Sequence, residues 1–411
     1  MTPSILQVID SFHQGGTERQ AVQLTRMLHE TGRYTVHVAC LTNEGILKHD
    51  VERLGLGPIH AFPTVSFYHP SIGRQIARFV RVLRQLKIDL VHTHDFYTNI
   101  LGMAGATLAG VPVRIASRRE TDPGRTAAQR WVERRAFDAA HRIVVNADAI
   151  GADLVARGVP AAKIRTVYNG LDPARFRVTT GTRRDRLAAF GIPANRRVVT
   201  ILANLWLVLK DHPTFLRAAA IVRAAAPDTA FVVAGEGTLL EPLRQLASDL
   251  GIADHVYFIG RCQNVADLLS VTDVGVLSSV SEGFPNVLVE YMAAGLPVVT
   301  TDVGGAREAV SDGRTGFVVP PRDAEAMAAR ILRLLHDADE RRTMGARAQQ
   351  MAWEKFSCAA QLAGVEQLYE QLFDATPLSR GNRPSARPAH PQGSAAGTED
   401  IARRPAASRA S

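Results

Sequence analysis

The fold is decided by residues 281–297, which read SEGFPNVLVEYMAAGLP. An apolar run ends near Leu277, a glycine-containing loop follows, and the pattern then predicts a helix. Pro285 stands where that helix is expected to begin, and Gly295 and Pro297 mark its end. A helix that starts directly after a strand turns its free N–H groups toward the ligand side, which suits a phosphate. The stretch therefore predicts a strand–loop–helix unit with an anion site at the start of its helix.

Three polar side chains of this unit are placed to bind a ligand. Asn286 and Glu290 are four residues apart, so they share one face of the helix. Glu282 lies in the loop just ahead of them. One carboxylate can accept hydrogen bonds from both hydroxyls of a ribose. We therefore expect Glu290 to hold a ribose and Glu282 to reach the same ligand.

The same alternation of apolar runs and helical patterns fills the rest of the chain. Strands are expected at 5–9, 35–41, 89–94, 113–116, 143–146 and 164–167, and again at 198–203, 230–234, 256–259, 274–277, 298–301 and 316–319. Because helical stretches separate these runs, the sequence predicts two doubly wound, Rossmann-like α/β domains with parallel sheets. Such sheets bind ligands at the carboxyl ends of their strands, and two domains offer the cleft between them.

The boundaries of these domains follow from breaks in the pattern. The first domain is expected over 1–172 and the second over 173–352, which begins with a polar, arginine-rich connector. A final helix is expected over 353–373. Residues 377–411 are rich in Pro, Ala, Ser and Arg and have almost no large apolar side chain. They are therefore expected to form a disordered tail.

The composition is that of a globular protein. The chain has 411 residues, of which 46% are hydrophobic and 21% charged, and its net charge is +8. This composition excludes fibrous and wholly disordered classes. No apolar run approaches the ~20 residues of a membrane span, and no basic secretory leader opens the chain. Three scattered cysteines do not make a disulfide framework, so we expect a cytoplasmic protein.

Residues 282–290, with a glutamate at each end and AAGLPVV shortly after, resemble the donor-site motif of retaining family 4 glycosyltransferases of the GT-B architecture. The resemblance covers nearly the whole of 5–373. A GGTE loop from Gly15 opens a helix, and VHTH ends a strand at His94. The resemblance implies that the second domain binds the donor nucleotide and the first binds the acceptor. It also implies that the helix at 353–373 packs back onto the first domain.

The resemblance assigns roles to single residues. It implies that His94, Lys210 and Glu282 take part in catalysis, with His94 facing the transferred sugar. A lone histidine at a strand end is often only a structural hydrogen-bonding group, and that alternative stays open for His94. Donor binding is implied for Gly15, Gly16, Asn204, Arg261, Phe284, Pro285, Asn286, Val287 and Glu290.

Position 204 departs from the family pattern. The family has an arginine about six residues before its lysine, whereas this chain has Asn204 before Lys210. A lysine at a strand–helix junction can place a point charge on a diphosphate. An asparagine offers only a hydrogen bond, so the sequence leaves the second cation of the diphosphate site open.

The resemblance implies a retaining glycosyltransferase of the hexosyltransferase type. Its donor would be a UDP- or GDP-linked sugar, and its acceptor a glycan or lipid-linked molecule of cell-surface polysaccharide or glycolipid synthesis. No metal or other cofactor is implied. A sugar-nucleotide epimerase of the same fold and a non-catalytic relative that binds nucleotide sugars are the alternatives.

Two metal sites are weaker hypotheses. Residues 337–339 spell the D-x-D of metal-dependent glycosyltransferases, but they fall between two helical stretches and are expected on the surface. His92, His94 and Asp95 would need a further, distant ligand to hold a metal.

The net charge is unevenly placed: residues 1–172 carry +6, residues 173–376 carry −2 and residues 377–411 carry +4. Two groups of basic residues stand out in the first domain, one a helical stripe and the other a cluster: Arg74, Arg78, Arg81, Arg84 and Lys87, and then Arg118, Arg119, Arg125, Arg130, Arg134 and Arg135. The stripe fits either a core-packed helix with a solvated face or a peripheral contact with an anionic membrane. Phe79 and Trp131 are the only aromatic residues that interleave with these positions, so nucleic acid is not an expected partner.

Overall fold

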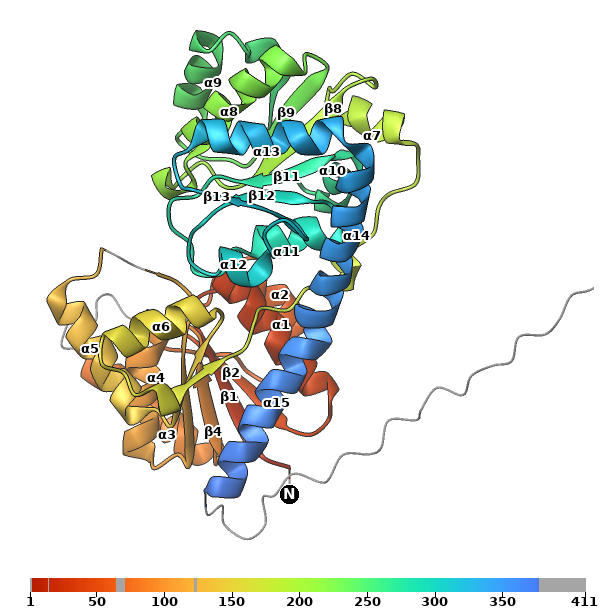
Figure 1. The fold of residues 1–411 in the computed structure, drawn as a ribbon. Coiled ribbons are helices and arrows are strands. Elements are labelled where there is room, and N and C mark those ends of the chain that lie inside the picture. The colour runs from red at the N-terminus through yellow and green to blue at the C-terminus, as the bar shows by residue number, and fades with distance from the viewer. Residues whose placement is uncertain (1, 14, 64–70, 122–123, 377–411) are drawn as a thin grey trace, which may run out of the picture.

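Two parallel sheets, each covered by helices on both faces, stack as two lobes (Figure 1). The computed structural model describes residues 2–13, 15–63, 71–121 and 124–376. The predicted tail at 377–411 lies outside the described residues. The predicted fold class, a pair of doubly wound α/β units, is confirmed.

The first lobe is built on a seven-stranded sheet with the order β3-β2-β1-β4-β5-β6-β7. Its strands are β1 (Ser4–Ile9), β2 (Thr35–Cys40), β3 (His60–Ala61), β4 (Leu90–Thr93), β5 (Val113–Arg118), β6 (Arg142–Val145) and β7 (Ile164–Thr166). Its helices are α1 (Gly16–Glu30), α2 (Lys48–Glu52), α3 (Ser71–Gln85), α4 (Phe96–Ala109), α5 (Ala127–Ala139), α6 (Asp148–Ala156) and the short η1 (Ala161–Lys163). Strands covered on both faces are mostly apolar, as β1 is in SILQVI, and its buried Gln7 is hydrogen-bonded to Tyr369.

The second lobe is built on a six-stranded sheet with the order β10-β9-β8-β11-β12-β13. Its strands are β8 (Arg197–Leu202), β9 (Thr229–Ala234), β10 (Val256–Gly260), β11 (Val274–Leu277), β12 (Val298–Thr301) and β13 (Gly316–Val319). Its helices are α7 (Arg183–Ala189), η3 (Val208–Lys210), α8 (His212–Ala225), α9 (Leu240–Asp249), η4 (Ala253–His255), α10 (Val265–Val271), α11 (Asn286–Ala293), α12 (Ala306–Ala309), α13 (Ala324–His336) and α14 (Ala338–Lys355). The connector before it holds η2 (Pro173–Phe176).

The last helix, α15 (Cys358–Ala375), lies along the first lobe (Figure 1). Its apolar face shares one buried cluster with Ile5 and Leu90 of the first sheet. The sequence suggested one helix over 353–373, but α14 runs to Lys355 and α15 begins only at Cys358. The break occurs because Ser357 caps α15 through a 3.2 Å hydrogen bond from the Ala360 N–H.

The two crossings between the lobes run side by side. The Leu171 N–H donates to the Phe356 carbonyl over 2.7 Å, and the Cys358 N–H donates to the Leu171 carbonyl over 3.2 Å. The outgoing connector and the returning chain therefore form a short parallel bridge at one point.

The structure corrects part of the proposed basic surface. Arg118, Arg119 and Arg125 are buried, and Arg118 and Arg125 both pair with Glu133. A buried arginine needs an acidic partner, and Glu133 provides it from the next helix. These residues belong to the interior of the first lobe and not to a membrane-facing patch. On α3 the basic side chains are exposed, but the helix ends at Gln85, before Lys87.

No helix in the described part of the chain combines the length and the apolar character that crossing a membrane requires.

Candidate functional site

A cavity of about 670 Å³ lies between the lobes, lined by residues of both. The first lobe contributes the loop before α1, α1 itself and the segment after β5. The second lobe contributes the segment after β8, the loop after β10 and the stretch at 282–290. Every residue predicted for the site except His94 lines it: Gly15, Gly16, Asn204, Lys210, Arg261, Glu282, Phe284, Pro285, Asn286, Val287 and Glu290.

Helix α11 is held firmly against the second sheet. The Tyr291 hydroxyl accepts a 2.7 Å hydrogen bond from the Leu202 N–H at the end of β8. A Cβ at Gly275 would lie 2.4 Å from the Tyr291 ring, so β11 can approach the helix this closely only with a glycine there. Pro285 precedes the first helical residue, with ψ near 95°, so α11 starts at Asn286, one residue later than expected.

Lys210 and Glu282 form one pair of opposite charges in the cavity. The Lys210 ammonium donates to Glu282 Oε1 over 2.7 Å, and the Ser279 hydroxyl donates to the same oxygen over 2.6 Å. Ser278 donates to the Lys210 carbonyl over 2.8 Å and fixes the lysine's backbone. The pair therefore places a cation and an anion side by side near the start of α11.

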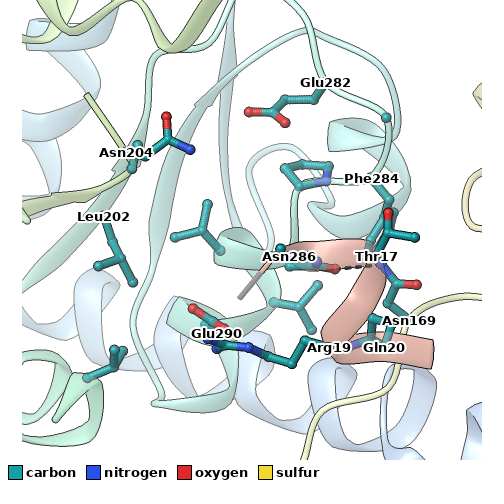
Figure 2. A pocket seen from close by; sticks show the side chains of 18 of the residues that line it. Thr17, Arg19, Gln20, Asn169, Leu202, Asn204, Glu282, Phe284, Asn286 and Glu290 are labelled. Carbon is teal, nitrogen blue, oxygen red and sulfur yellow. Dashed lines mark hydrogen bonds between the residues drawn. The ribbon is translucent and has the colours of Figure 1, made fainter. Parts of the chain in front are cut away.

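Glu290 and Arg175 form a second pair. Glu290 is buried on the cavity wall, and the Arg175 guanidinium donates to its Oε1 over 2.7 Å. Arg175 comes from η2 in the connector, whereas Glu290 comes from α11. Figure 2 shows Glu290 and Asn286 on the same side of α11, facing Arg19 and Asn169 of the first lobe.

Hydrogen bonds join the lobes beside this helix. Arg119 donates to Asn169 Oδ1 over 2.8 Å, and Asn169 Nδ2 donates to Asn286 Oδ1 over 2.7 Å. The contact is close elsewhere too, since a Cβ at Gly283 would lie 2.6 Å from the Arg119 carbonyl oxygen. A Cβ at Gly16 would lie 3.4 Å from Asn286 Nδ2, so the starts of α1 and α11 meet at the cavity.

His94 lies behind this cavity. Its side chain is buried and borders a small second cavity of about 10 Å³, which also touches Arg119. Arg119 approaches Nδ1 at 3.4 Å, so Nε2 carries the hydrogen and donates to Gln7 Oε1 over 2.8 Å. Burial, together with His92 and Arg119, keeps the His94 pKa well below its usual value, so the ring is neutral.

Asp95 follows His94 and has an unusual environment. Burial, reinforced by the Asp10 and Glu18 carboxylates, raises the pKa of Asp95 to about 7. One of its oxygens caps α4 by accepting a 2.9 Å hydrogen bond from the Thr98 N–H. The other is buried without a partner among the described residues. This carboxyl group therefore keeps its proton to a higher pH than an ordinary aspartate does.

In the part of the chain that it describes, the structure does not bring the residues of the two hypothetical metal sites together with further ligands. Within the described residues no three or more His, Cys, Asp or Glu side chains gather as a metal site. The His92 ring nitrogens are bonded to Tyr369 and Ser117, at 2.8 and 2.9 Å, which accounts for both of them. Asp337 caps α14 by accepting from the Glu340 N–H over 2.8 Å.

Several polar residues that line the cavity were not predicted for the site, among them these four: Arg19, Arg119, Asn169 and Arg175. Asn169 precedes a glycine, a pair that indicates only a turn, and Arg175 lies in the polar connector. Arg19 directly follows the GGTE loop, which was the available signal. All four come from the first lobe or the connector, and the sequence motif lies in the second.

Comparison with known proteins gives consistent matches. A model of "Glycosyltransferase Family 4" matches residues 14–175, and a model of "Glycosyl transferases group 1" matches residues 183–351. The D-inositol 3-phosphate glycosyltransferase 2 of Catenulispora acidiphila is 32% identical over 309 residues, which are 70% of this chain and 71% of that protein.

Other relatives match over less of their length or show only the fold. The N-acetyl-alpha-D-glucosaminyl L-malate synthase of Bacillus anthracis is 31% identical over 52% of this chain, and the match spans only 55% of that protein. The crystal structure of Anabaena HepE in complex with UDP superposes with a TM-score of 0.80 at 22% identity, covering 90% of this chain and 100% of that one. The paired parallel sheets match this GT-B structure, and the sequence matches extend over both lobes. The chain therefore belongs to the family 4 glycosyltransferases, the group 1 glycosyl transferases.

Proposed function

We propose that this protein is a retaining glycosyltransferase that moves a hexose from a UDP- or GDP-linked donor to a glycan or lipid-linked acceptor. The observation that carries the proposal is the meeting of Lys210, Glu282, Glu290 and the start of α11 in one interlobe cavity. A cation, a helix N-terminus and a buried carboxylate are the groups that a diphosphate and a ribose require.

The charges in the cavity suit the departure of a nucleoside diphosphate. As the bond to the sugar breaks, negative charge grows on the diphosphate, and a preorganised cation stabilises it. Lys210 and the N–H groups at the start of α11 would meet that charge. Glu282, already beside Lys210 at 2.7 Å, would lie near the sugar, and Glu290 would hold the ribose hydroxyls.

The first lobe would complete the site from the opposite side. The Gly15–Gly16 loop lines the cavity, so a donor bound to the second lobe would be covered by it. Covering the donor excludes water, which favours transfer to an acceptor over hydrolysis. His94 lies behind the cavity wall and would influence the donor through Arg119, which approaches its Nδ1. A motion of the first lobe that exposed His94 to the cavity would allow a direct contact with the sugar.

The acceptor would enter from the first lobe. The exposed basic face of α3 supports an anionic acceptor or a peripheral contact with an anionic membrane surface. The likeness to a UDP-bound structure supports UDP as the first nucleotide to try.

The test is binding of UDP, GDP, ADP and CDP to the purified chain by thermal shift, with and without a chelator. A rise in Tm with one nucleotide, unchanged by chelator, is expected. The sugar conjugates of that nucleotide are then incubated without acceptor. Conversion of the sugar without acceptor would support the epimerase instead, and the absence of any nucleotide-dependent shift would contradict a functional donor site.

A further inference from the structure

We propose that Arg19 binds the diphosphate of the donor from the first lobe, as the second cation of the donor site. This inference rests on the proposed function, because it concerns the same ligand. It adds a residue from α1 to the cations that line the cavity, and Arg19 would reach the donor from the lobe opposite Lys210.

Arg19 has no partner within the described part of the protein. No hydrogen bond or ion pair engages its guanidinium, although the side chain lines the cavity and is partly buried. The other cations of the wall differ: Lys210 donates to Glu282 and Arg175 to Glu290, each over 2.7 Å, and Arg119 donates to Asn169 over 2.8 Å. A partly buried guanidinium with five unused N–H donors is a group prepared for an external acceptor.

The surroundings of Arg19 favour an anion. Arg175 and Arg261 lie close enough to lower its pKa together with burial, and Glu290 is the carboxylate that opposes them. Since Glu290 already accepts from Arg175, the positive charge around Arg19 is not balanced by this carboxylate alone. A diphosphate carries at least two negative charges and would neutralise the excess.

The position of Arg19 matches the path of a donor. Figure 2 shows its side chain reaching from α1 toward Glu290, across the space between the lobes. A ribose on Glu290 would place the first phosphate toward Asn286 and the start of α11, one helical turn away along the same wall. Arg19 is then beside the ribose–phosphate junction, where a guanidinium can donate two parallel hydrogen bonds to phosphate oxygens.

Because the side chain at position 204 is neutral, a contact from Arg19 would supply a positive charge that this position lacks. Asn204 lines the second-lobe wall and supplies no charge there. Lys210 shares its charge with Glu282, so a cation from the first lobe adds to the stabilisation of the leaving diphosphate. Because Arg19 belongs to the opposite lobe, its contact forms only when the lobes are together, and donor binding therefore favours the closed arrangement.

Arg19→Gln tests this role in the full chain, with UDP and uridine as probes and isothermal titration as the readout. Arg26→Gln is the matched control, since Arg26 lies on the same helix but bonds Asp172 and does not line the cavity. Loss of one charge-assisted contact predicts UDP binding weaker by about tenfold or more in Arg19→Gln. Uridine affinity should stay unchanged, and the control should bind both like wild type.

Further measurements distinguish a phosphate contact from a structural role of Arg19. Arg19→Lys should bind UDP with intermediate affinity, because it keeps the charge and loses the fork of donors. The Tm of unliganded Arg19→Gln should not fall, because Arg19 stands among like charges. Equal UDP affinity in Arg19→Gln and wild type would overturn the inference, as would a parallel loss of UDP and uridine binding with a lowered Tm. If wild type bound none of the four nucleoside diphosphates, the proposed function itself would fail, and this inference with it.

Discussion

Asn169 Nδ2 donates to Asn286 Oδ1 over 2.7 Å, and this bond ties the end of the first lobe to the first residue of α11. With its oxygen engaged in this way, the Asn286 amide keeps its own N–H groups turned away from Asn169. These N–H groups lie close to Gly16, at the cavity. The first lobe thus orients a side chain that the second lobe offers to the ligand.

Lys210→Ala should lower turnover by about 100-fold or more, the usual effect of removing a group that stabilises developing charge. The measurement is kcat with a saturating donor. Lys48→Ala is the control, because Lys48 lies on α2, pairs with Glu52 on its own helix at 3.5 Å and does not line the cavity. Turnover close to wild type in Lys210→Ala would remove this lysine from the mechanism.

Glu290→Gln should remove most of the preference of the protein for UDP over its 2′,3′-dideoxy analogue. Wild type is expected to bind UDP more tightly than its 2′,3′-dideoxy analogue by about 1.5–3 kcal/mol, the range for hydrogen bonds to a charged group. In Glu290→Gln most of that difference should vanish, while the fold is kept because the amide has the same shape. Titration of both ligands into both proteins gives the answer, and an unchanged difference would contradict the ribose role.

Gly283→Ala should reduce kcat/KM for the donor by about 100-fold, because a displacement of about 1 Å at a catalytic site has such effects. The added Cβ would lie 2.6 Å from the Arg119 carbonyl oxygen, which belongs to the opposite lobe, so the lobes must move apart. Gly73→Ala provides the comparison, since a Cβ there meets nothing within 4 Å. Equal kcat/KM in the two variants would show that the closed contact at Gly283 is not needed.

Asp95→Asn should change how stability depends on pH. Burial raises the folded-state pKa of Asp95 from 3.8 to about 7, so the folded protein holds a proton that the unfolded chain has released. The stabilisation from this proton is complete below about pH 4 and is lost as pH rises through about 7; at about 1.4 kcal/mol per pKa unit, its upper bound is about 4 kcal/mol. Asparagine also caps helices, so the variant keeps the start of α4.

The measurement for Asp95 is the Tm of both proteins at pH 5 and pH 8. The advantage of wild type over Asp95→Asn should shrink, or reverse, at the higher pH. Because the comparison is between two proteins at the same pH, the titration of His92 and His94 largely cancels. A Tm difference that is the same at both pH values would show that Asp95 is ionised throughout.

The sequence placed the second-lobe lining of the cavity, and the roles of these residues stay predictions. The strand, loop and helix around Glu282 and Glu290 are contiguous, so periodicity and the Pro and Gly positions were enough to place them. The Arg119, Asn169 and Arg175 side chains reach the same cavity from distant points of the chain. Their placement depends on how the lobes pack, which no local pattern contains.

Burial was also hard to predict from local patterns. Arg118 and Arg125 looked like surface charges because arginine is usually exposed, but Glu133, on the next helix, allows both to be buried. The end of α14 is a further case: the helical pattern continues beyond Lys355, but Ser357 caps a new helix, and Phe356 and Cys358 bond Leu171.

The paired crossing at Leu171 and Ser357 makes the second lobe an insertion in the first. The chain leaves the first lobe and re-enters it at nearly the same place, so the two ends of the inserted second lobe lie next to each other. The first lobe is therefore completed only after the second lobe has been synthesised, since α15 covers its sheet. During synthesis the second lobe can finish folding before α15 is available to cover the sheet of the first lobe.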